Sequence, residues 1–82
     1  MSVAKEELPD LPPLDKGEYA HYKGDHYEVL GVAYHTETLD PMVVYRPLYD
    51  TKAELFARPF AMFTENVVVD GEVKPRFVRV DE

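Results

Sequence analysis

The sequence contains no cysteine, so neither a disulfide framework nor a thiolate metal site can stabilise its fold. No apolar run approaches the roughly 20 residues that a membrane-spanning helix needs. The N-terminal segment Met1–Pro9 also lacks the apolar core and small-residue cleavage site of a secretory signal. We therefore expect a cytoplasmic protein without membrane contact.

Basic residues are scarce: 9 lysines and arginines stand against 16 aspartates and glutamates, for a formal net charge of −7. This balance disfavours nonspecific binding to duplex nucleic acid, which needs a concentrated basic surface. An acidic net charge is still compatible with a local basic pocket that binds nucleic acid. The chain has 82 residues, 45% of them hydrophobic, which indicates a single small globular domain.

Prolines divide the chain into two parts. Pro9, Pro12 and Pro13 disfavour a helix, so residues 1–16 are predicted to form a loose or extended acidic arm. Residues 17–82 are predicted to form the folded domain.

The folded part is rich in β-branched and aromatic residues that alternate with polar ones, a pattern typical of strands. Gly24-Asp25 and Asp70-Gly71 are expected to form tight turns, the second of type I′ with Val67–Val69 leading in and Phe77–Val80 returning. The predicted strands are residues 18–23, 26–35, 42–49, 54–58, 67–69 and 77–80.

The second predicted strand changes phase. Tyr27 and Val29 share one parity, whereas Leu30, Val32 and Tyr34 share the other. One extra residue in a strand turns every later side chain over, so we predict a β-bulge or sharp bend near residues 29–31. Bent strands favour a barrel over a flat sheet.

A short helical turn is predicted at Phe60–Phe63. Five to six short strands and this turn indicate an all-β fold, a small closed or half-closed barrel. The residues expected to form its core are Phe56, Phe60, Phe63 and Phe77, with Val44, Leu48 and Leu55.

Five segments carry a family resemblance: HYKGDHYEVLGVA, HTET, VVYRPLY, RPFAMF and PRF, in this order. From about Gly17 to Val80 the chain resembles a small bacterial family known only as domain of unknown function 1653. The resemblance implies an SH3-type barrel and no established activity, substrate or cofactor. The family usually has a basic residue where Tyr34 stands and a tryptophan where Phe56 stands.

A set of stacking and charged side chains could line a shallow groove that binds an anionic or aromatic ligand, such as a peptide or a nucleotide. The alternative is a structural network in which Arg46 or Arg58 pairs with Glu37. The candidate ligand-binding residues are Tyr22, Lys23, His35, Glu37, Tyr45, Arg46 and Arg58.

Metal and catalytic chemistry are less well supported. His21, His26 and His35 lack the closely spaced acidic or thiolate ligands that would complete a metal site, so no metal or cofactor is expected. A small hydrolytic enzyme would use His35 as a general base assisted by Glu37. Nothing in the sequence encloses that pair.

A third hypothesis is a structural or interaction protein. Val67–Val69, with Pro75 opposite, could recruit another strand if it lies at a sheet edge. We expect a monomer or a weak homodimer on this basis. The binding module is the function that the sequence favours.

Overall fold

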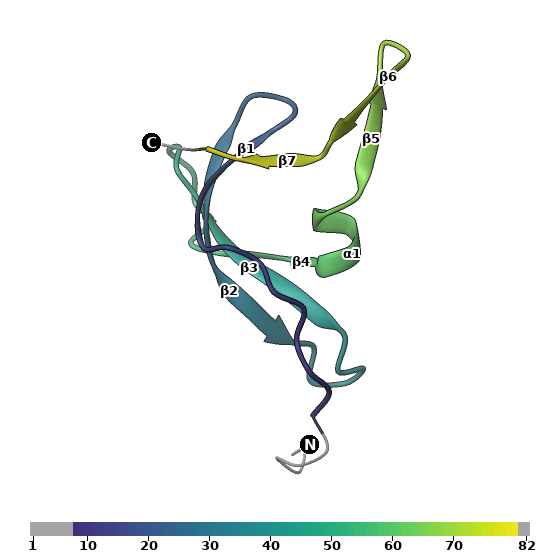
Figure 1. Cartoon of the computed structure of the whole chain (residues 1–82). Coiled ribbons are helices and arrows are strands. Elements are labelled where there is room, and N and C mark those ends of the chain that lie inside the picture. Colours follow the sequence, from purple (N-terminus) through teal and green to yellow (C-terminus); the bar gives the residue numbers. More distant parts are fainter. Residues whose placement is uncertain (1–7, 81–82) are drawn as a thin grey trace.

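A computed structural model describes residues 8–80 of the chain. Seven strands and one helical turn follow in the order β1 (Gly17–His21), β2 (His26–Tyr34), β3 (Pro41–Pro47), β4 (Phe56–Pro59), α1 (Phe60–Phe63), β5 (Asn66–Val69), β6 (Glu72–Pro75) and β7 (Phe77–Arg79) (Figure 1). The prediction of an all-β fold with one short helical turn is confirmed. There are seven strands in place of the predicted five to six.

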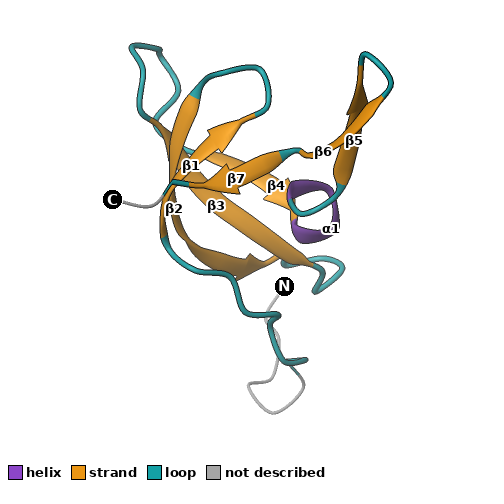
Figure 2. Cartoon of the chain, turned by 45° about the horizontal axis from the view of Figure 1, so that its top comes forward, coloured by secondary structure: helices purple, strands orange, loops and turns teal. Residues whose placement is uncertain are grey.

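Five strands form one antiparallel sheet in the order β4-β3-β2-β1-β7, and β5 and β6 form a separate hairpin. The larger sheet curls so that β7 and β4, its two edges, both approach the side on which α1 lies (Figure 2). The hairpin projects away from this curled sheet in both views (Figures 1 and 2).

The predicted bulge lies in β2. Its register against β3 shifts between Val29 and Gly31, so Val29 lies opposite Tyr45 and Gly31 lies opposite Val44. The two halves of β2 therefore turn different parities toward the interior, which lets one strand serve both parts of the curved sheet.

The Asp70-Gly71 turn forms as predicted, but the strand that returns from it differs from the predicted one. Asp70 and Gly71 have φ values of 52° and 81°, as a type I′ turn requires. The returning strand is β6, in which Val73 lies opposite Val68. The expectation that Phe77–Val80 returns against Val67–Val69 is wrong, because the chain leaves the hairpin at Arg76 and β7 pairs with β1.

Aromatic rings fill the interior. Phe63 and Phe77 stack with ring centroids 4.0 Å apart, and Tyr45 contacts both. The buried core consists of Tyr19, Val29, Val43, Tyr45, Phe63 and Phe77, with Leu14, Tyr27, Phe56 and Phe60 packed against it.

Three predicted core residues lie elsewhere. Leu48 and Leu55 are 41% and 54% exposed, and Val44 is only half-buried. The β3 register explains the difference: Val43 and Tyr45 face the interior, so Val44 between them faces outward. Leu48 and Leu55 lie in the connection between β3 and β4, outside both strands.

The part of the N-terminal arm that the structure describes runs along the sheet without forming a strand. Leu14 packs on the core, and the backbone carbonyls of Asp15 and Pro9 accept hydrogen bonds from the hydroxyls of Tyr19 and Tyr34. Tyr34 therefore has a structural contact in this chain. Residues 1–7 of the predicted arm lie outside the described residues.

Candidate functional site

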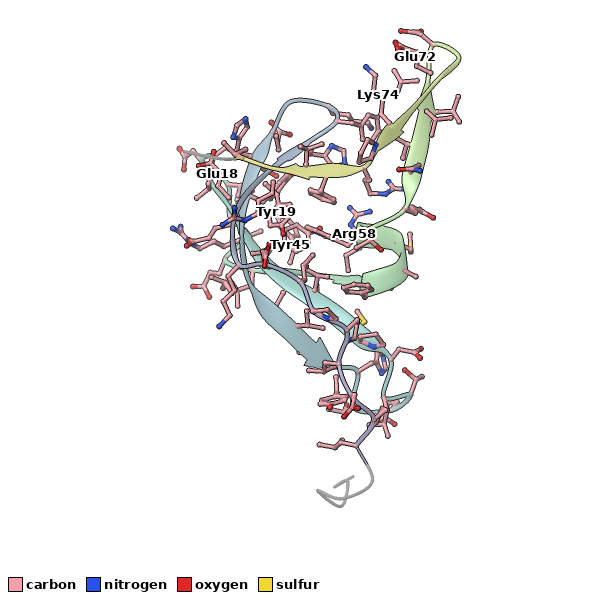
Figure 3. All side chains as sticks on the ribbon, in the orientation of Figure 1. Glu18, Tyr19, Tyr45, Arg58, Glu72 and Lys74 are labelled. Carbon is pink, nitrogen blue, oxygen red and sulfur yellow. The ribbon has the colours of Figure 1, made fainter. Side chains whose placement is uncertain are left out.

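Arg58 lies on the inner face of the curled sheet. It is directly opposite Val43, whose side chain is fully buried, and cross-strand partners share a face. Its Nε donates a hydrogen bond of 3.1 Å to the Tyr45 hydroxyl, and its guanidinium carbon lies 5.7 Å from the centroid of the Phe77 ring. Figure 3 shows Arg58 between β7 and the segment formed by β4 and α1. Within residues 8–80, no carboxylate pairs with this half-buried cation.

His21 continues the inner face from Arg58 to the first turn. It lies opposite Phe77 in the β1–β7 register, with ring centroids 4.9 Å apart. On its other side it packs on Tyr22 at 4.5 Å, and the Nζ of Lys23 lies 5.8 Å from the Tyr22 ring. Gly24 has a φ of 109°, a conformation that glycine adopts without strain and that closes this turn.

The electrostatic environment of His21 is positive. Burial lowers its pKa from the ordinary value of 6.5, and the charges of Arg58, Arg76 and Lys23 lower it further, while Asp25 acts in the opposite direction. Three cations from separate segments therefore act electrostatically on one imidazole, in a protein whose net charge is −7. We call this group the basic-aromatic cluster: His21, Tyr22, Lys23, Arg58, Arg76 and Phe77.

Arg76 has a structural role within the cluster. Its Nε donates to the carbonyl of Met62 at 3.0 Å, and its guanidinium forms an ion pair with Glu65. These contacts fix the junction of β6 and β7 against α1. Because Glu65 already neutralises part of its charge, Arg76 offers less to a ligand than Arg58 does.

Further aromatic rings adjoin the cluster. Tyr27 lies 5.8 Å from Phe77 and 6.4 Å from His21, centroid to centroid. Its hydroxyl lies 3.1 Å from that of Tyr49. Burial, followed by this hydrogen bond, raises the pKa of Tyr27 and so disfavours the charged form of its phenol still further.

The predicted site residues lie in three separate places: the basic-aromatic cluster, the outer face of the sheet, and the loop between β2 and β3. Tyr22, Lys23, Tyr45 and Arg58 come together around His21 and Phe77. Arg46 lies opposite Glu28 on the outer face and forms an ion pair of 2.6 Å with it. The predicted alternative pairing of Arg46 or Arg58 with Glu37 does not occur.

His35 and Glu37 lie in the loop between β2 and β3, at the opposite end of β2 from the first turn. The Nδ1 atom of His35 accepts hydrogen bonds from the amides of Glu37 and Thr38, at 3.2 and 3.4 Å. The imidazole is exposed and orders its own loop. This geometry lacks the enclosed pocket that a general base at His35 would require.

Sequence reasoning missed His21, Arg76 and Phe77 as members of the site. From the sequence, His21 is only an incomplete metal ligand, Phe77 is only a core residue, and Arg76 is only part of the PRF segment of the family resemblance. The available signal was the segment His21-Tyr22-Lys23 itself, where a ring and a cation flank a predicted turn. Recognising it also required knowing that β7 pairs with β1.

Two shallow hollows lie away from the basic-aromatic cluster. One, of about 290 Å³, lies on the outer face between Glu18, Glu28 and Arg46. The other, of about 320 Å³, is mainly apolar and is lined by residues that include Pro41, Pro59 and Phe60. Within residues 8–80 no group of three or more His, Asp or Glu side chains is placed to hold a metal ion, and no helix is long and apolar enough to cross a bilayer.

The fold and the site define a small all-β domain whose curled sheet holds arginine and aromatic side chains on its concave face. The family model described as a protein of unknown function, DUF1653, matches residues 17–79, and this chain belongs to that family. A crystal structure of a protein of this family from Bordetella bronchiseptica is 38% identical in sequence, with a TM-score of 0.77. The match covers 82% of this chain and 87% of that one. No functionally curated protein matches the sequence.

Proposed function

We propose that this protein is a recognition module that binds an anionic ligand at the basic-aromatic cluster. The ligand class that suits the cluster is a phosphate or carboxylate group attached to a flat ring or a short extended chain, as in a nucleotide or an acidic peptide. The proposal treats the domain as a bacterial, cytoplasmic barrel of SH3 type, as its sequence suggests.

Arg58 is the observation that carries this proposal. A half-buried guanidinium without a carboxylate partner keeps much of its capacity to form charge-assisted hydrogen bonds. The Tyr45 hydroxyl and the Phe77 ring hold it in one orientation through its Nε and its planar face. Its terminal nitrogens stay available for the oxygens of an anion.

The rings beside Arg58 support a ligand that also stacks. Tyr22 is 36% exposed and forms the open border of the cluster, next to the more buried His21. Stacking of a base on an exposed aromatic ring contributes about 1–3 kcal/mol. Lys23, at the turn, adds a flexible second cation.

The test is a titration of amide and imidazole NMR signals with four probes: inorganic phosphate, a nucleoside monophosphate, its uncharged nucleoside and a short acidic peptide. We expect the nucleotide or the peptide to shift signals of His21, Tyr22 and Arg58. We expect phosphate to shift the same signals at higher concentration, and salt to weaken every response. Unchanged signals at the cluster with all four probes would overturn the proposal.

Matched variants locate the site. Arg58→Gln should weaken binding about tenfold or more, because it removes one charge-assisted contact. Lys23 is exposed in the turn after β1, so Lys23→Gln should leave folding unchanged and weaken binding severalfold. Arg46→Gln makes the same charge change on the outer face and should leave binding unchanged. Equal losses for Arg46→Gln and Arg58→Gln would show that binding is nonspecific.

A further inference from the structure

The β5–β6 hairpin has no partner in the curled sheet. It forms a two-stranded sheet of its own, and Val68 and Val73, a directly opposite pair on one of its faces, are 71% and 67% exposed. An isolated two-stranded hairpin is only marginally stable in water. Both of its edges therefore present backbone groups that a further strand could use.

The hairpin is held firmly at its base. The backbone N–H of Arg76 donates to the carbonyl of Glu65, and the Arg76 side chain contacts both Met62 and Glu65. These bonds connect the two ends of the hairpin next to α1. The hairpin thereby extends in a fixed direction, and its strand β6 carries Glu72 and Lys74 at a distance from Arg58 (Figure 3).

The register shows which groups of β6 face outward. In a hairpin closed by a two-residue turn, the residues flanking the turn form a hydrogen-bonded pair, and such pairs alternate along the ladder. Glu72 and Lys74 therefore direct their backbone groups toward Val69 and Val67 of β5. Val73 directs its N–H and C=O toward the open edge of β6.

We propose that two copies of this chain pair along their β6 edges, antiparallel and centred on Val73, so that their hairpins form one four-stranded sheet. A two-fold axis at Val73 lets this residue exchange two backbone hydrogen bonds with Val73 of the partner subunit. It also places Glu72 opposite Lys74 of the partner subunit, and the symmetry repeats this attraction. This proposal is independent of the proposed anion site.

Charge complementarity selects this register. An axis at Glu72 would oppose two glutamates, and an axis at Lys74 would oppose two lysines, both of which are unfavourable. Centring on Val73 is the arrangement in which both charges of each strand meet opposite charges. The same residues thus disfavour the neighbouring registers.

The dimer is expected to be weak. Pro75 has no N–H, so it cannot donate to the partner strand and the new ladder stays short. Pairing along one four-residue strand should bury less than the roughly 1,200–2,000 Å² of a stable interface. Exposed ion pairs also weaken with salt. Self-association should therefore appear at high protein concentration and low ionic strength.

Charge exchange tests the register directly. Glu72→Lys and Lys74→Glu each create like-charge pairs in a homodimer, and each should abolish the association measured by sedimentation equilibrium of the full chain. Mixing these two variants restores opposite charges at every pair, and the double variant Glu72→Lys/Lys74→Glu does so within one chain. We expect both to associate at least as strongly as the unaltered protein.

Lys52 and Glu54 provide matched controls, because they are exposed residues with the same two-residue separation in the loop between β3 and β4. Lys52→Glu and Glu54→Lys make the same changes in net charge and should leave association unchanged. A monomer at all concentrations would overturn the proposal and assign Glu72 and Lys74 to edge protection. Association that ignores the β6 charge changes, or a mixture that fails to associate, would overturn it as well.

Discussion

The arginines on the two faces of the curled sheet have different kinds of partner. Arg46 on the outer face pairs with the carboxylate of Glu28, and both side chains are substantially exposed. Arg58 on the inner face contacts a hydroxyl and an aromatic ring in place of a carboxylate. An arginine that a carboxylate already neutralises, such as Arg46, has little charge left to attract a ligand. An arginine held in place without a carboxylate, such as Arg58, keeps its charge for binding an anion.

The same division holds for the neighbouring residues. On the outer face, Glu18 lies opposite Glu28, which lies opposite Arg46, and His26 pairs with Glu18. Each of these two glutamates thus has a basic partner on the outer face, His26 for Glu18 and Arg46 for Glu28. On the inner face, the cations gather around aromatic rings, so the acidic net charge of the chain does not describe the local charge at the cluster.

The largest expected effect comes from the stack beneath Arg58. Phe63→Ala removes a ring that is almost fully buried and stacked on Phe77, and should cost about 3–5 kcal/mol of the free energy of unfolding. Small domains have only about 5–15 kcal/mol in total, so thermal denaturation should show a greatly lowered Tm.

Leu55→Ala is the matched control for that loss. The side chain is 54% exposed, so its truncation should change the stability by no more than about 0.5 kcal/mol. Similar losses for the two variants would contradict the core described above. They would instead favour the core predicted from sequence, in which Leu55 was a member.

Local sequence signals predicted most of the fold, and pairing between distant segments accounts for the errors. The bulge near Val29, the glycine turns and the helical turn at Phe60–Phe63 all depend on neighbouring residues, and all are confirmed. The partner of β7 could not be predicted, because a strand of three residues has no pattern that chooses between the hairpin and β1.

The candidate site was predictable in part for the same reason. Tyr22, Lys23, Tyr45 and Arg58 were recognised by residue type, and the fold brings them together. Arg46 was grouped with them by residue type as well, but adjacent residues of a strand face opposite sides, so it lies on the other face from Tyr45. His21 and Phe77 joined the cluster only once the β1–β7 register was known.

Removing the Tyr45 hydroxyl should cause an intermediate loss of stability, larger than the loss from breaking the ion pair on the outer face. Tyr45→Phe removes the acceptor that orients Arg58, and a partly buried hydrogen bond to a charged group should cost about 1–2 kcal/mol. Glu28→Gln removes the outer ion pair and should cost about 0–1 kcal/mol.

Salt separates these two losses further. The cost of Glu28→Gln should shrink in chemical denaturation at high salt, since exposed pairs are screened, while the cost of Tyr45→Phe should persist. If both costs shrink equally, the Arg58 contact is a surface interaction like that of Arg46. Tyr45→Phe should also weaken anion binding, because the guanidinium loses its fixed orientation.

The smallest expected effect is a pH dependence of folding stability that arises from His21 on the inner face. The pKa of His21 is lower in the folded protein than its ordinary value of 6.5, chiefly because of burial and then because of Arg58, Arg76 and Lys23. Below about pH 6.5 the unfolded chain therefore binds more protons than the folded one, and stability falls as the pH decreases. This contribution is fully present above that pH, and His21→Gln should remove it from the pH profile of chemical denaturation.

A bound anion should act on His21 in the opposite direction, because negative charge beside the imidazole favours its protonated form. Saturating phosphate or nucleotide should thus raise the pKa of His21 measured by NMR and flatten the acid-side loss of stability. Arg58→Gln should raise the pKa of His21 without any ligand, since one nearby cation is gone, while Arg46→Gln should not. A His21 pKa that responds equally to both substitutions would show that the two faces share one diffuse field, and the distinction between a paired and a positioned arginine would fail.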